Sequence, residues 1–166
     1  GFIEVGSTVD VGTEIRIFLP AKSAPTSPKS RLPTEPPRGG SETILVAEDD
    51  PGVQRLTQRF LEGAGYTVLL TRDGAEALEQ FDSQPDAIGL ALLDVVMPKV
   101  GGRQVFEHIR KLRPDIPVIF ASGYSADESI GALLSEGQVE FLSKPYLRDD
   151  LLRSVRELID SRGAQS

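Results

Sequence analysis

The sequence contains no cysteine among its 166 residues, so neither a disulfide framework nor a thiolate metal site is possible. It also lacks an excess of basic side chains, with 18 lysines and arginines against 25 acidic residues and a formal net charge of -7. Nonspecific binding to nucleic acid or to an anionic membrane requires a basic face. We therefore expect neither nucleic acid nor a membrane as a direct partner.

Long apolar runs are absent as well. No stretch approaches the roughly 20 consecutive apolar residues that cross a bilayer, and the opening GFIEVGSTVD has neither the basic nor the apolar region of a signal peptide. The simplest expectation is a cytoplasmic chain. Its first residue, Gly1, is not methionine, which is consistent with a piece of a longer protein.

A proline-rich segment divides the chain into two unequal parts. Residues 21–41 are crowded with Pro, Ser, Lys and Arg and hold almost no apolar residues, so this segment cannot bury enough surface to offset the entropy of ordering it. It is interpreted as a flexible linker. Before it, residues 1–20 show two apolar runs around a Gly-rich turn, which predicts a β-hairpin. A lone hairpin is marginal in water, so these residues are expected to be the trailing edge of a larger domain.

After the linker, short apolar runs alternate with amphipathic segments. Several runs are continuously apolar, as expected of strands buried on both faces. Alternation with short loops predicts an α/β fold, a doubly wound five-stranded parallel sheet with helices on both faces. The strand candidates are Thr43–Ala47, Tyr66–Leu70, Ile88–Leu93, Ile116–Ala121 and Val139–Leu142.

Helical patterns fill the gaps between the strand candidates. The first covers about residues 51–64, with Asp50 as its N-cap, and its apolar face is predicted to consist of Val53, Leu56, Phe60 and Leu61. Asp73 and Glu76 frame the second like a capping box. The third covers residues 105–112, a weaker fourth covers residues 130–134, and the fifth covers residues 151–159.

Polar residues gather where the predicted strands end, the edge at which ligands bind in such sheets. They are Glu48 and Asp49, then Asp94, Ser122 and Lys144. Several carboxylates in one pocket repel each other unless a cation lies among them, and an all-oxygen, cysteine-free cluster suits Mg²⁺. A metal beside a hydroxyl and a lysine is what phosphoryl transfer needs. Asp94 is then the candidate nucleophile, forming an acyl phosphate.

Residues 42–162 resemble a CheY-like receiver domain of response regulators. The resemblance is carried by ILVAEDD, LLDVVMP with Gly102, PVIFASGY and FLSKP, which occur in this order at strand ends. It implies a (βα)5 flavodoxin-like fold and a role in two-component signal transduction. It further implies that Asp94 accepts a phosphoryl group from a phosphohistidine.

The same resemblance assigns roles to the remaining site residues. Mg²⁺ would be held by Asp49, Asp94, Glu48 and the main-chain carbonyl of Val96. Ser122 and Lys144 would bind phosphoryl oxygens. Ser122 and Phe141 would act as the conformational switch, and the bond between Lys144 and Pro145 would be cis.

The opening residues resemble, through VGTEIRIFLP, the last strands of a histidine-kinase ATP-binding domain. This implies a hybrid histidine kinase parent with residues 163–166 as a tail after the receiver. The ATP-binding boxes are absent, so the fragment is expected to catalyse at most its own phosphorylation and dephosphorylation. The implied partners are a histidine kinase or a histidine phosphotransfer protein, and a second copy of the chain in a dimer through the fourth helix, fifth strand and fifth helix.

Three other functions compete with this interpretation. An aspartyl phosphatase on a similar fold commonly has a second Asp two residues after the first, where Val96 stands here. A flavin-binding module needs a phosphate loop after the first strand, and the acidic EDD sequence there would repel a phosphate. A degenerate receiver, acting as a docking or autoinhibitory module without phosphorylation, remains the alternative. The one histidine, His108, is interpreted as a solvated helix residue.

Overall fold

The computed structural model describes residues 1–19, 37–123 and 138–163, which fall into two compact units. The first unit is the predicted hairpin, made of β1 (Phe2–Thr8) and β2 (Gly12–Phe18) in antiparallel register. One face of this ribbon pairs Ile3 with Ile17 and Val5 with Ile15. All of its residues are exposed.

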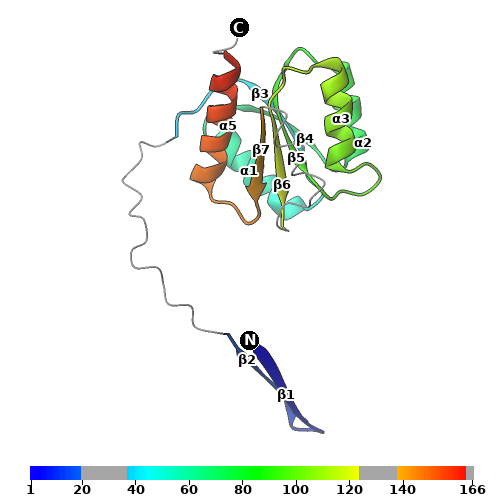
Figure 1. Cartoon of the computed structure of the whole chain (residues 1–166), viewed down its shortest axis with the longest axis vertical. Coiled ribbons are helices and arrows are strands. Elements are labelled where there is room, and N and C mark those ends of the chain that lie inside the picture. Colours follow the sequence, from blue (N-terminus) through cyan, green and yellow to red (C-terminus); the bar gives the residue numbers. More distant parts are fainter. Residues whose placement is uncertain (20–36, 124–137, 164–166) are drawn as a thin grey trace. The chain divides into compact units, whose positions relative to one another are not determined.

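The second unit is built on a five-stranded parallel sheet (Figure 1). The strand order is β4-β3-β5-β6-β7, so the chain winds outward from β3 in both directions. This confirms the doubly wound parallel sheet predicted from the sequence. The strands are β3 (Thr43–Ala47), β4 (Thr67–Thr71), β5 (Ile88–Asp94), β6 (Val118–Ser122) and β7 (Val139–Ser143).

Helices cover both faces of this sheet (Figure 1). In the described part of the chain they are α1 (Pro51–Glu62), α2 (Gly74–Ser83), α3 (Gly102–Leu112) and α5 (Arg148–Gly163). The helix predicted at residues 130–134 lies outside the described residues. None of the helices just named is long and apolar enough to span a bilayer.

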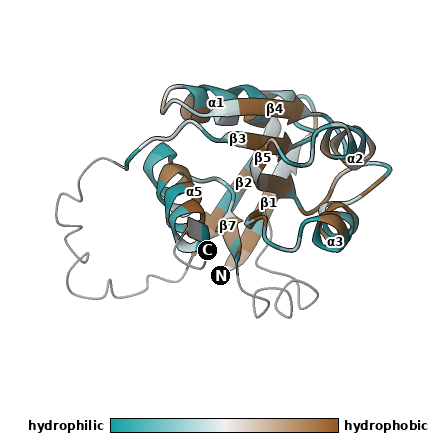
Figure 2. Cartoon of the chain, turned by 90° about the horizontal axis from the view of Figure 1, so that it is seen from above, coloured by the Kyte–Doolittle hydropathy of each residue, from teal (hydrophilic) through white to brown (hydrophobic). Residues whose placement is uncertain are grey.

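Two apolar layers hold the helices on the sheet. Figure 2 shows the central strands as mainly hydrophobic and the helices as two-sided. Between the sheet and the pair α2 and α3, the core includes Phe81, Phe106 and Phe120, all at most 2% exposed. Between the sheet and the pair α1 and α5, it includes Leu61 and Leu152. Burial of this apolar surface is the main favourable contribution to folding.

The apolar face predicted for α1 is wrong in one respect. Leu56 is 46% exposed, whereas the buried residues of the helix are Gln54, Thr57 and Leu61. Two polar side chains that the predicted face left out, those of Gln54 and Thr57, are therefore buried, whereas Leu56 is not. This arrangement is stable because both make hydrogen bonds in the interior.

The predicted N-caps of α1 and α2 agree with the structure, whereas α3 and α5 each begin three residues earlier than predicted. Asp50 caps α1, accepting hydrogen bonds from the backbone N–H groups of Gly52 and Val53. These bonds lower the pKa of Asp50. Asp73 caps α2 by accepting from the N–H of Glu76, whose own carboxylate accepts from the N–H of Arg72. The carboxylate of Asp50 therefore serves as the N-cap of α1.

Asp115 lies in an ion-pair cluster between α3 and α5. It accepts two hydrogen bonds from Arg113 at 2.9 Å and one from Arg162 at 2.6 Å. The hydrogen bond from Arg113 is the main cause that lowers the pKa of Asp115 to about 2. The cluster ties the end of α3 to the end of α5.

We expect Asp115→Asn to lower the free energy of unfolding at pH 7 by about 1 kcal/mol, a value discounted because the side chain is 45% exposed. A carboxylate with a lowered folded pKa stabilises the fold above its unfolded pKa of about 3.9. This contribution is lost as the pH falls through about 2. Urea titrations should therefore show the deficit shrinking from pH 4 toward pH 2, with a smaller effect for Asp86→Asn, whose side chain is 96% exposed.

Candidate functional site

The polar residues predicted at the strand ends do come together at one edge of the sheet. Asp94 is the last residue of β5 and pairs in register with Ala121 of β6. Ser122 ends β6 opposite Ser143 of β7, and Lys144 follows directly. Parallel strands in register bring their carboxyl ends to a common edge, so residues distant in the sequence become neighbours.

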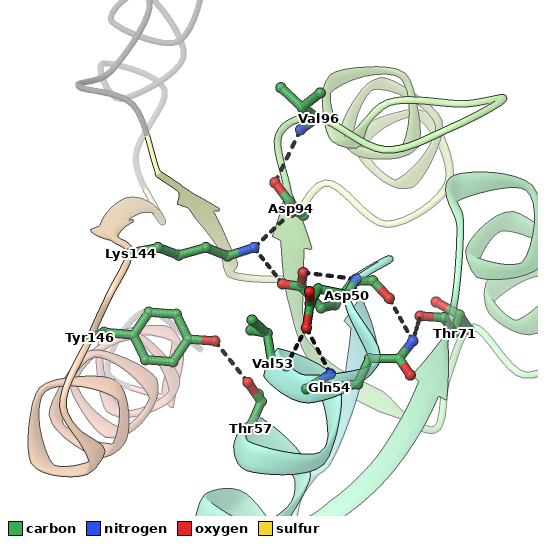
Figure 3. Close-up of polar contacts among 11 residues, drawn as sticks. Asp50, Val53, Gln54, Thr57, Thr71, Asp94, Val96, Lys144 and Tyr146 are labelled. Carbon is green, nitrogen blue, oxygen red and sulfur yellow. Dashed lines mark hydrogen bonds and ion pairs between the residues drawn. The ribbon is translucent and has the colours of Figure 1, made fainter. Parts of the chain in front are cut away.

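Lys144 lies between two carboxylates (Figure 3). Its Nζ donates to Asp94 Oδ2 at 2.6 Å and to Glu48 Oε2 at 2.5 Å. The three side chains are largely buried, with 16% of Lys144, 12% of Asp94 and 5% of Glu48 exposed. Two acids that would otherwise repel each other thus share one ammonium group.

Burial and the shared hydrogen bonds act in opposite directions on the pKa values of Glu48 and Lys144. Burial raises the pKa of Glu48, although the hydrogen bond from Lys144 acts in the opposite direction. Burial also acts to lower the pKa of Lys144, but the hydrogen bonds to Asp94 and Glu48 outweigh it and leave that pKa raised. Lys144 therefore stays charged at neutral pH and supplies a fixed positive charge at the edge of the sheet.

Three carboxylates are placed to hold a cation. Glu48, Asp49 and Asp94 each offer an oxygen, and these atoms lie within 4.8 Å of one another. Glu48 and Asp94 are buried and Asp49 is exposed, so the cluster is open to solvent on one side. A hard, all-oxygen donor set with room for water ligands fits Mg²⁺.

The loop after Asp94 has a tightly fixed path. The N–H of Val96 donates to Asp94 Oδ1 at 3.1 Å (Figure 3), while its side chain is 67% exposed. Met97 packs into the core beneath the loop. A Cβ at Gly102 would overlap the carbonyl oxygen of Asp94, so only glycine lets α3 begin this close to the strand end.

The other predicted site residues border this cluster. Ser122 is 6% exposed, and its carbonyl accepts from the N–H of Lys144 at 2.8 Å. The peptide bond between Lys144 and Pro145 is cis. Phe141 is partly buried and packs against the layer under α2 and α3.

His108 lies away from these residues. It is on α3, and its Nε2 is 2.6 Å from Asp82 Oδ1 of α2. Its side chain is 35% exposed. It contacts none of the carboxylates at the strand ends.

Sequence reasoning missed the polar residues that support the site from α1. Gln54 Nε2 donates to the carbonyls of Glu48 and Thr71, and the hydroxyls of Thr57 and Tyr146 are 2.7 Å apart (Figure 3). Their signal in the sequence is weak, because polar residues in an amphipathic helix are assigned to solvent by default.

The arrangement suits transfer of an anionic group to a carboxylate. One oxygen of Asp94 is held by a backbone N–H and the other by an ammonium group, so its orientation is fixed before a substrate arrives. Lys144 and a cation on the acids would neutralise charge on the incoming group. A carboxylate attacks as an anion and needs no general base to act as a nucleophile.

Comparison with known proteins finds relatives of the larger unit. A family model described as response regulator receiver domain matches residues 44–156. The sensor kinase CckA of Brucella abortus is 34% identical over 98% of this chain and 18% of its own length. The response regulator MprA of Mycobacterium ulcerans is 37% identical over 72% of this chain and 50% of its own length. The chain therefore spans half or less of the length of these two relatives.

Solved structures give a similar result. The response regulator TrrA of Thermotoga maritima, crystallised in complex with Mg²⁺ and BeF, superimposes with a TM-score of 0.61 at 30% identity. The match covers 70% of this chain and 98% of that one.

Proposed function

Because the chain belongs to the response regulator receiver domain family, whose model matches residues 44–156, we propose that it accepts a phosphoryl group on Asp94. Receiver domains serve phosphorylation-based signalling in two-component systems. The observation that carries the proposal is the placement of Lys144 between Asp94 and Glu48, at 2.6 and 2.5 Å. A lysine held against a nucleophilic carboxylate is ready to bind a phosphoryl oxygen.

In the proposed reaction an oxygen of Asp94 attacks the phosphorus of a phosphohistidine. The new P–O bond forms as the P–N bond breaks, and the imidazole leaves with the electron pair and takes up a proton. Lys144 donates to one phosphoryl oxygen and the hydroxyl of Ser122 to a second. The product is an acyl phosphate at the end of β5.

Glu48, Asp49, Asp94 and the main-chain carbonyl of Val96 are proposed to hold Mg²⁺. Bound there, the ion would neutralise charge that develops on the phosphoryl oxygens. The clustering of three carboxylate oxygens within 4.8 Å supports this assignment. So does the complex of the related TrrA with Mg²⁺ and BeF. Ser122 and Phe141 are proposed as the residues that change conformation after phosphorylation.

Receiver domains interact with histidine kinases or phosphotransfer proteins, and we propose one of these as the phosphodonor or acceptor here. The match to a sensor kinase over 98% of this chain supports a hybrid histidine kinase as the parent protein. Residues 1–20 would then be the tail of its ATP-binding domain, 21–41 the linker and 42–162 the receiver. A cytoplasmic location and a dimer through the predicted fourth helix, β7 and α5 belong to the same proposal.

The test is incubation of the chain with acetyl phosphate, followed by intact mass. With MgCl₂ present we expect a gain of one phosphoryl group per chain. Removing the metal with EDTA is expected to slow the gain at least about 100-fold, because the carboxylates then repel the donor. An equal gain with and without the metal would contradict the Mg²⁺ assignment, and no gain at all would favour the unphosphorylated docking module.

A further inference from the structure

Helix α1 buries two polar side chains on the face that meets the sheet. Gln54 is 7% exposed and Thr57 is 1% exposed, and they are one turn apart. A buried polar group costs free energy unless it is hydrogen-bonded. Each of these side chains satisfies that requirement with a partner outside the helix, and the two partners belong to different halves of the proposed site.

The hydrogen bonds of Gln54 fix the side of the proposed site that carries the carboxylates, here called the acidic half. Its Nε2 donates to the carbonyl of Glu48 at 2.5 Å and to that of Thr71 at 3.1 Å. The N–H of Glu48 also donates to the carbonyl of Thr71, at 3.2 Å. The hydroxyl of Thr71 is bonded in turn to the carbonyl of Val46. Both backbone polar groups of Glu48 are therefore fixed, and with them the start of the loop that carries Asp49.

The hydrogen bond of Thr57 fixes the segment that follows Lys144, here called the lysine half. Its Oγ1 is 2.7 Å from the hydroxyl of Tyr146, which is two residues after Lys144. The Tyr146 ring packs in the layer between α1 and α5. Figure 3 shows Gln54 and Thr57 extending from α1 toward these two sides of the cluster.

We propose that α1 sets the spacing between the carboxylates and Lys144, with Gln54, Thr57 and Tyr146 as positioning residues. This inference rests on the proposed function. Gln54 governs how the acids hold the cation. The pair of Thr57 and Tyr146 governs how Lys144 meets the phosphoryl group. Because separate hydrogen bonds hold the two halves, a variant of one half should change Mg²⁺ affinity and a variant of the other should change the phosphorylation rate.

Gln54→Leu is expected to weaken Mg²⁺ binding about tenfold, the lower end of the effect seen for groups that orient metal ligands. The phosphorylation rate at saturating Mg²⁺ should change little. Tyr146→Phe should do the reverse, lowering the rate at saturating Mg²⁺ about fivefold, as for the loss of one hydrogen bond, with Mg²⁺ affinity unchanged. Thr57→Val should match Tyr146→Phe, and Thr57→Ser should restore the wild-type rate.

The experiment uses the full 166-residue chain. Calorimetric titration with MgCl₂, without a phosphodonor, gives the affinity, and a time course of intact mass with acetyl phosphate gives the rate. Matched controls are Gln58→Leu, which removes a glutamine that bonds Glu62 within the same helix, and Tyr66→Phe, which removes a hydroxyl just before β4, at the opposite end of the strands. Both controls should retain wild-type values.

The double variant Thr57→Val with Tyr146→Phe should be no slower than either single variant, because the three lack the same bond. The inference is overturned if Gln54→Leu keeps its affinity for Mg²⁺, or if Tyr146→Phe and Thr57→Val keep the wild-type rate while only their melting temperatures fall. If the wild type gains no phosphoryl group, the proposed function fails, whereas the calorimetry still decides the role of Gln54.

Discussion

Replacing Asp94 by asparagine is expected to leave the chain folded but without a phosphoryl group after incubation with acetyl phosphate and Mg²⁺. The side-chain amide does not form an acyl phosphate, so the nucleophile is lost while shape and volume are kept. Intact mass should show a gain below detection, at least about 100-fold slower than wild type.

The fold should tolerate this change. Asparagine keeps one acceptor oxygen, which can bond either Lys144 or the N–H of Val96. The loss of one hydrogen bond is offset by weaker repulsion with Glu48, so we expect the free energy of unfolding within about 1 kcal/mol of wild type. Urea unfolding monitored by circular dichroism measures this directly.

A matched control separates the site from general loss of charge. Asp82→Asn removes a carboxylate from α2 that is 51% exposed and bonds His108, and it should gain a phosphoryl group at the wild-type rate. If the mass gain persists in Asp94→Asn, the acceptor is another residue and the site assignment is wrong.

The sequence predicted the sheet because buried strands leave a strong pattern, but their ends were less certain. The strand predicted as Ile88–Leu93 continues through Asp94, which pairs with Ala121, although a carboxylate interrupts the apolar run. The strand predicted to begin at Ile116 begins at Val118, since Pro117 has no N–H to donate. The ends of these strands are set by the hydrogen bonds between neighbouring strands, and the hydropathy pattern does not show which residues make those bonds.

The acid and lysine cluster was predictable despite its long sequence separations. Lys144 is 96 residues from Glu48 and 50 residues from Asp94, yet each residue follows a predicted strand. The topology of a parallel sheet brings such positions together without further information.

The supporting polar residues were not predictable by the same reasoning. Thr57 and Tyr146 are 89 residues apart, and neither is a charged residue directly after a predicted strand. In α1, the predicted apolar face included Leu56 and left out Gln54. The structure exposes Leu56 and buries Gln54, whose hydrogen bonds to Glu48 and Thr71 make its burial favourable.

The loss of Lys144 is the other change with a large expected effect. Lys144→Met keeps an unbranched side chain, one atom shorter, but removes the charge shared by Glu48 and Asp94. The donor for one phosphoryl oxygen is lost with it, and removal of one such group typically costs about 100-fold or more in rate. Intact mass should show phosphorylation slowed by this factor at saturating Mg²⁺, whereas Lys111→Met, on the exposed side of α3, should behave as wild type.

The same variant should also unfold more easily at neutral pH. Two buried carboxylates are left without their cation, at a cost of about 3–5 kcal/mol. The pKa of Glu48, already raised by burial, should rise further when Lys144 no longer donates to it. An acid whose pKa is higher in the folded state binds protons more readily there than in the unfolded state. The free energy of unfolding of the chain therefore rises as the pH falls toward the unfolded pKa of a glutamate, about 4.3. Urea titrations should therefore show the deficit of Lys144→Met narrowing as the pH falls from neutral toward about 4.3, and a deficit that widens over this range would contradict the assigned ion pair.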